Sequence, residues 1–182
     1  MELAGSAYLY ALAQISIAFV AFSTIVIVVR LGMGAALSKS HLLLIRLYIE
    51  LGFMATAFSM LPMLLATLGW SHTAVWRASQ ILSLIVSGWW ILIYPKRHRA
   101  STSKPMPRFV HIEYVIGLLV GLYGWANAIG YPYEPYVGPY AVGVTWALVL
   151  AGLMFLLTMN VFLRSNATKD NQEPTKPNTR VP

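Results

Sequence analysis

Residues 7–31 read AYLYALAQISIAFVAFSTIVIVVRL, an apolar run whose one charged side chain, Arg30, stands at its end. A helix needs about 20 predominantly apolar residues to cross the hydrocarbon core of a bilayer. The run is longer than the roughly 7–15 apolar residues of a signal peptide, and its leader carries Glu2 and no basic residue. It therefore predicts a membrane-spanning helix that is not removed as a signal.

Four further apolar runs of comparable length follow, at about residues 42–70, 74–94, 109–131 and 140–163. Of the 182 residues, 58% are hydrophobic and 10% are charged, against roughly 25% charged in soluble domains. This composition excludes a soluble enzyme and a disordered protein, and the lack of Cys excludes a disulfide scaffold. Segments in lipid must satisfy their own backbone hydrogen bonds. The sequence therefore predicts an all-α integral membrane protein, a bundle of five transmembrane helices within residues 1–164.

The basic residues predict how the bundle is oriented. Twelve of the 13 Lys and Arg residues follow the first, third and fifth runs or begin the second, and only Arg77 falls on the other side. Cytoplasmic loops carry an excess of Lys and Arg, so we expect the N-terminus outside and the C-terminus in the cytoplasm. The expected location is the cell membrane, multi-pass, of bacterial inner-membrane type. The polar tail 165–182 is predicted to be disordered, and residues 96–108 and 131–140 to be loops.

Ionisable side chains inside the runs are the first place to look for a function, because placing them in a membrane is costly. Arg46 and Glu50 are four residues apart and share a helix face. His111 and Glu113 lie near the same, cytoplasmic, side. One hypothesis is a polar cluster of these four residues that binds an ion or a proton. The alternative is structural: Arg46 and Glu50 pair with each other, and carboxylates near helix N-termini are stabilised by the helix dipole.

Two amide side chains and a set of small residues can each be interpreted as functional or as structural. Gln80 and Asn127 either line a polar pathway or form hydrogen bonds between helices. Small side chains allow helix backbones to approach closely, which predicts tight packing of the fourth and fifth spans on each other or on a second subunit. The small residues with helical spacing are Gly117, Gly121, Gly124, Gly143, Ala147 and Ala151.

No set of residues predicts catalysis, a metal site or a cofactor. No Lys lies inside a run, the one Asp is Asp170 in the tail, and the four His residues lie at the edges of runs or in loops. Zinc ligands have recognisable spacings, and none occurs here. The basic residues are spread over three segments without a recognition motif, which disfavours nucleic-acid binding.

Three functions remain after these exclusions. The first is a homo-oligomeric channel or transport subunit with a polar cluster on the cytoplasmic side. The second is a non-catalytic accessory or assembly subunit of a membrane complex. A membrane enzyme acting on lipid or quinone is the least supported of the three. The expected partners are the lipid bilayer and either further copies of this chain or another membrane protein.

Overall fold

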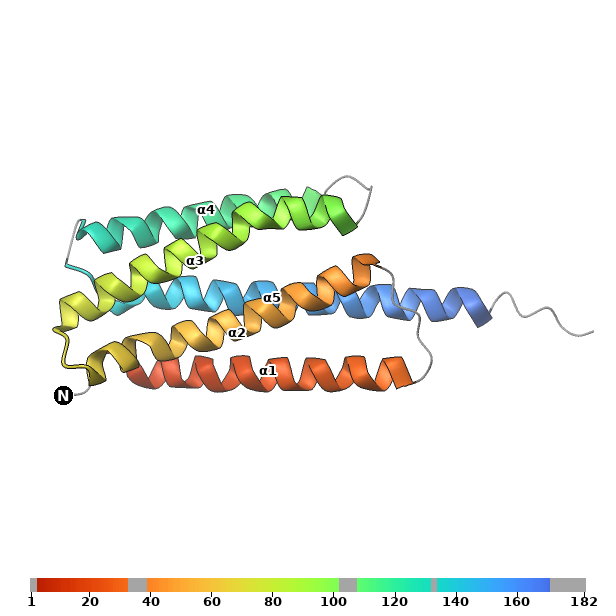
Figure 1. Ribbon diagram of the computed structural model, residues 1–182, viewed down its shortest axis with the longest axis horizontal. Helices are drawn as coiled ribbons and strands as arrows, with labels where there is room; N and C mark the ends of the chain where they lie inside the picture. Colours follow the sequence, from red (N-terminus) through yellow and green to blue (C-terminus); the bar gives the residue numbers. More distant parts are fainter. Residues whose placement is uncertain (1–2, 33–38, 102–107, 132–133, 171–182) are drawn as a thin grey trace, which may run out of the picture.

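The structure, a computed structural model, describes residues 3–32, 39–101, 108–131 and 134–170. Within these residues the chain forms five helices and no strand (Figure 1). Each helix contains a segment that is long and apolar enough to cross a membrane, so the prediction of five apolar helices is confirmed. The helices are α1 (Ser6–Gly32), α2 (Lys39–Thr67), α3 (His72–Ser101), α4 (Arg108–Ile129) and α5 (Val137–Asp170).

Helix α3 is longer than the third predicted span. It continues through Pro95 to Ser101, so residues 96–101, predicted as the start of a loop, are helical. The continuation places the basic residues after Pro95 on the last turns of a helix. The remainder of that predicted loop, residues 102–107, lies outside the described residues.

Helix α5 exceeds its predicted span at both ends. It begins at Val137, with Pro139 in its first turn, where a missing backbone N–H removes no intrahelical bond. It ends at Asp170, so residues 165–170 of the segment predicted to be disordered are helical. Residues 171–182 lie outside the described residues.

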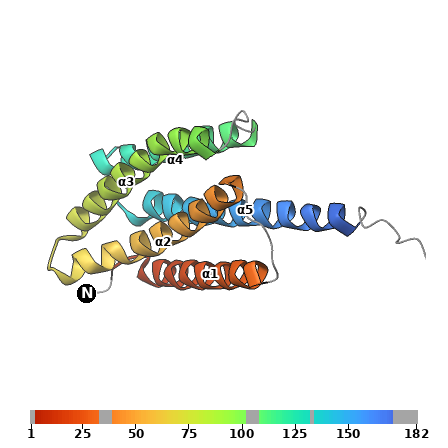
Figure 2. The same cartoon turned by 45° about the vertical axis from the view of Figure 1, so that its right-hand side comes forward.

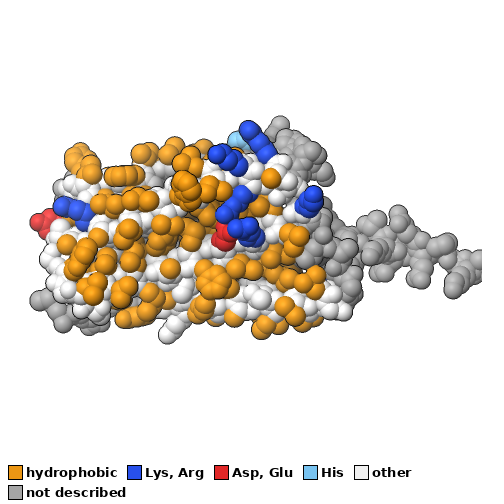
Figure 3. Space-filling model, viewed as in Figure 1, with side chains coloured by type: hydrophobic (Ala, Val, Ile, Leu, Met, Phe, Trp, Pro, Cys, Tyr) orange, Lys and Arg blue, Asp and Glu red, His pale blue; other side chains and the backbone are white. Residues whose placement is uncertain are grey.

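The five helices form two groups. Helix α2 packs against α1, α3 and α5, while α4 packs against α3 and α5. Figures 1 and 2 show α3 and α4 running together on one side of α2 and α5, with α1 on the other side. We call the end of the bundle at which α1 and α3 finish the basic end, because Arg and Lys side chains gather there (Figure 3).

Pro62 lies inside α2 and leaves one carbonyl of the helix without its usual donor. A proline has no N–H to give to the carbonyl four residues earlier, which here is the carbonyl of Phe58. The hydroxyl of Tyr140, a fully buried residue of α5, donates a 2.6 Å hydrogen bond to the Phe58 oxygen. A side chain of α5 therefore replaces the backbone hydrogen bond that α2 loses at Pro62.

In α3, the hydrogen bond lost at Pro95 is replaced in the same way by a side chain of α4. The carbonyl four residues before Pro95 belongs to Ile91, and the hydroxyl of Tyr114 donates to its oxygen at 3.3 Å. Thus Pro62 and Pro95, the two prolines beyond the first turn of a described helix, each have their freed carbonyl bonded to a tyrosine of a neighbouring helix. In an apolar environment such a carbonyl has no water to bond, so each tyrosine ties two helices together.

Replacing Tyr140 by Phe should destabilise the protein by about 1–3 kcal/mol, the cost of an unsatisfied buried carbonyl. In a Pro62→Ala background the residue at position 62 supplies its own N–H, so the same replacement should cost clearly less. Thermal unfolding of the four proteins of this double-mutant cycle measures the difference. Tyr131→Phe, at an exposed tyrosine, is the matched control. Equal costs of Tyr140→Phe in both backgrounds would show that the hydroxyl does not compensate Pro62.

Candidate functional site

Glu50 is the centre of a polar cluster that joins α2 to α3. Its Oε1 accepts a 2.6 Å hydrogen bond from Nε of Arg46, one turn earlier on α2. Its Oε2 accepts hydrogen bonds from Nη1 of Arg97 at 2.5 Å and from Nε1 of Trp90 at 3.1 Å, both on α3. We call these four residues the Glu50 clamp. Both carboxylate oxygens have partners, and two of the three donors are cationic.

The predicted pairing of Arg46 with Glu50 is confirmed, but the other two members of the clamp were not predicted. Arg97 falls in a segment predicted as a loop, and Trp90 belongs to no predicted site. Both positions follow from the continuation of α3 past Pro95, since residues seven apart share a helix face. The signal was therefore present in the spacing of Trp90 and Arg97, given a helix that includes both.

The other two members of the predicted cluster lie on α4. Glu113 borders a cavity, and its Oε2 is buried with no hydrogen-bond partner within the described part of the chain. His111 is exposed near the start of α4. The four residues proposed as one ion or proton site are therefore divided between the Glu50 clamp and α4.

The side chain of Asn127, near the end of α4, forms two hydrogen bonds with the backbone of the segment before α5. Its Oδ1 accepts a 3.1 Å hydrogen bond from the backbone N–H of Tyr136, and its Nδ2 donates to the Tyr136 carbonyl at 3.2 Å. The Tyr136 hydroxyl also forms a 3.0 Å hydrogen bond with the Tyr123 hydroxyl, which raises the pKa of Tyr136 above its ordinary value. Asn127 thus holds the segment before α5 against the end of α4.

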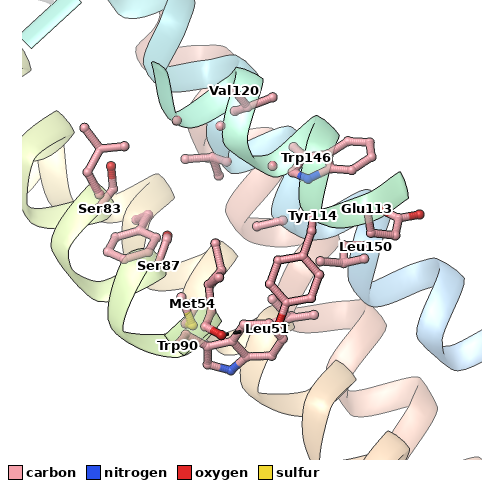
Figure 4. A pocket seen from close by; sticks show the side chains of 18 of the residues that line it. Leu51, Met54, Ser83, Ser87, Trp90, Glu113, Tyr114, Val120, Trp146 and Leu150 are labelled. Carbon is pink, nitrogen blue, oxygen red and sulfur yellow. Dashed lines mark hydrogen bonds between the residues drawn. The ribbon is translucent and has the colours of Figure 1, made fainter. Parts of the chain in front are cut away.

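A partly open cavity of about 140 Å³ lies between the α3–α4 pair and the helices α2 and α5 (Figure 4). On α3 the lining residues run from Gln80 to Tyr94, which corresponds to about 21 Å along a helix. The cavity therefore extends along the helices, and we call it the slot. Its apolar and aromatic lining includes Leu51, Met54, Trp90, Tyr94, Tyr114, Val120, Trp146 and Leu150.

Three of the predicted packing glycines line this slot, where the absence of a side chain leaves space. Counting atoms of the described residues, a Cβ added at Gly121 would meet none within 4 Å. At Gly117 or Gly143 it would meet one side-chain atom, at 3.9 Å. Ala147 also lines the slot, whereas Ala151 is fully buried among residues of α2 and α5. Contact of these glycines with a second subunit stays a prediction.

Polar side chains of α3 form a line along the slot. Gln80, Ser83 and Ser87 all line it, and their spacing of three and four places them on one helix face. Figure 4 shows Ser83 and Ser87 on the α3 side, with Glu113 beside Leu150 and away from both serines. Gln80 was a predicted site residue; the two serines were not, because nothing in the sequence says which face of α3 borders a cavity.

Comparison with family models, curated proteins and solved structures finds no match to this chain. The function is therefore argued from the geometry of the slot and of the Glu50 clamp. Within the described residues, no group of three or more His, Asp or Glu side chains is placed to hold a metal ion.

Replacing Glu50 by Gln should destabilise the protein by about 1–3 kcal/mol, because hydrogen bonds to a charged acceptor are the stronger ones and Arg97 loses its anionic partner. The measurement is the unfolding temperature in detergent. Glu134→Gln is the matched control, since it removes the same charge from an exposed position. If both variants unfold at the same temperature, the clamp does not hold α2 and α3 together.

Proposed function

We propose that the protein is a membrane-embedded transport subunit that binds an uncharged, lipid-soluble molecule in the slot between α2, α3, α4 and α5. The observation that carries this proposal is the slot itself, which is mostly apolar and partly open. Ligand sites are typically lined by apolar and aromatic side chains with a few polar groups. The slot has this composition along a length of about 21 Å, longer than half the thickness of a bilayer core.

Side chains leave a volume of about 140 Å³ unfilled in the slot, so the residues of its wall lack contacts that an occupant would supply. A slender apolar chain or a small ring would restore these contacts, since an engineered apolar cavity of about 150 Å³ takes up benzene.

The Glu50 clamp argues against an ion pathway at Glu50. Its carboxylate oxygens are already bonded to Arg46, Arg97 and Trp90. A permeating cation would have to displace two guanidinium groups, each of which would then lack a counter-ion. We therefore place the cargo of the proposed transport subunit in the slot and assign the clamp a structural role.

We further propose that the basic end faces the cytoplasm of a bacterial cell and that the N-terminus lies outside. The gathering of Lys and Arg at one end of the bundle (Figure 3) supports this orientation.

The chain contains no Cys, so single cysteines report the orientation directly. A membrane-impermeant maleimide should label Leu68→Cys in intact spheroplasts. It should label Ala100→Cys, near the basic end, only after permeabilisation. Both positions are exposed and lie at opposite ends of the helices. The reverse pattern would invert the proposed topology.

Filling the slot should exclude its ligand. In liposomes that contain a diazirine-bearing hydrocarbon chain, we expect photolabelling of Ser87 in the slot and of Leu92, an exposed residue of the same helix. Gly121→Phe should lower labelling of Ser87 roughly tenfold, the equivalent of about 1.4 kcal/mol of lost binding, and leave Leu92 unchanged. Leu122→Phe, at the exposed neighbouring position, should change neither.

Unchanged labelling of Ser87 in a folded Gly121→Phe protein would contradict binding in the slot. Native mass spectrometry after mild extraction from the protein's own membranes supplies the second measurement. A homo-oligomer that carries a small apolar adduct is the expected result. A foreign subunit in fixed ratio and no adduct would instead favour the accessory or assembly function.

A further inference from the structure

We infer that the molecule bound in the slot is a neutral amphiphile that carries a hydrogen-bond donor, a lipid-phase alcohol in the simplest case, and that this donor bonds to the side-chain amide of Gln80. The inference rests on the proposed function, because it names the chemical class of the ligand of the same slot. It is carried by Gln80, a residue that lines the slot and whose Oε1 has no hydrogen-bond partner within the described part of the chain.

Gln80 is the buried polar residue of the slot. Its side chain is 3% exposed, and its Oε1 has no hydrogen-bond partner within the described residues. A buried acceptor without a partner is unfavourable, and a donor that reaches it recovers that free energy. The last side-chain torsion of glutamine is broad, so the amide can turn its oxygen toward a donor in the slot.

The surroundings of Gln80 leave room for the amide. A Cβ at position 124 of α4 would lie 2.5 Å from Nε2 of Gln80, so a side chain there would displace the amide from its place between α3 and α4. One turn further along α3, the Ser83 hydroxyl donates its hydrogen to the backbone carbonyl of Gln80, not to its side-chain amide, at 2.8 Å. The Ser83 oxygen can then accept but not donate, so this end of the slot favours ligands that donate.

The position of the charged groups indicates a neutral head group. Glu113 borders the slot but is 11 residues from Gly124 along α4, or about 16 Å. The cations of the Glu50 clamp, Arg46 and Arg97, are bonded to Glu50. A charged head group at Gln80 would therefore lose its hydration without gaining a counter-ion, which is costly in an apolar site. A hydroxyl carries no such cost.

Two photoprobes that differ only in the donor test this inference: a diazirine-bearing long-chain primary alcohol and its methyl ether. In liposomes containing wild-type protein, the alcohol should label Ser83 and Ser87 roughly tenfold more strongly than the ether, as expected for one hydrogen bond to a desolvated acceptor. Gln80→Leu should reduce labelling by the alcohol to the level of the ether and leave labelling by the ether unchanged. Gln80→Met, which also lacks the acceptor, serves as a second variant if Gln80→Leu does not fold.

Ser79→Ala is the matched control. Ser79 is a buried neighbour whose hydroxyl has no partner in the described ranges. It does not line the slot, so the preference for the alcohol should persist. Equal labelling of the wild-type slot by both probes would overturn the assignment of a donor and leave the proposed binding function standing. Failure of both probes to label the slot would contradict the proposed function itself.

Discussion

The architecture depends on one constraint: in an apolar environment every backbone carbonyl must find a donor. Two prolines break this rule inside their own helices, and two tyrosines from other helices restore it. Tyr140 ties α5 to α2, and Tyr114 ties α4 to α3. The bundle is thereby divided into two tyrosine-linked pairs, α2–α5 and α3–α4, with α1 packed on the outer side of α2.

The slot is a consequence of how these two pairs meet. Near the start of α3, Trp76 packs on the ring of Tyr140 with centroids 5.9 Å apart. Near its end, Trp90 and Arg97 bond to Glu50 of α2. Helix α3 is therefore anchored to the other pair at both ends, and between the anchors the facing surfaces carry glycines and small polar residues. Interiors normally close such gaps, because lost dispersion contacts are costly. The gap between these two anchors is where we propose that a ligand binds.

The fold was largely predictable from the sequence, and the site was not. Length and hydropathy sufficed to place five helices. Helices α3 and α5 extend beyond the predicted spans, whose bounds follow hydropathy alone. Helix α3 continues past Pro95, and Tyr114 of α4 satisfies the carbonyl that this proline frees. Helix α5 continues into polar residues. The Arg46–Glu50 pair followed from local spacing. The roles of Arg97 and Trp90 and the position of the slot depend on which face of α3 meets α2. A row of small residues such as Gly117 and Gly121 has the same sequence pattern whether it brings helices together or leaves space between them.

Polar side chains whose hydrogen bonds are all made within the protein differ in role from those that have a hydrogen bond left to make. We assign the first a structural role and the second a role in ligand binding. At the Glu50 clamp every carboxylate oxygen has a partner, and Asn127 uses both ends of its amide to hold Tyr136. Such groups have little capacity left for a ligand. In two residues that line the slot, by contrast, Oε1 of Gln80 and Oε2 of Glu113 are buried and have no partner among the residues that the structure describes. Because an unmade buried hydrogen bond is more costly than a made one is stabilising, two such groups bordering one slot favour a site that is completed by a molecule from outside the chain.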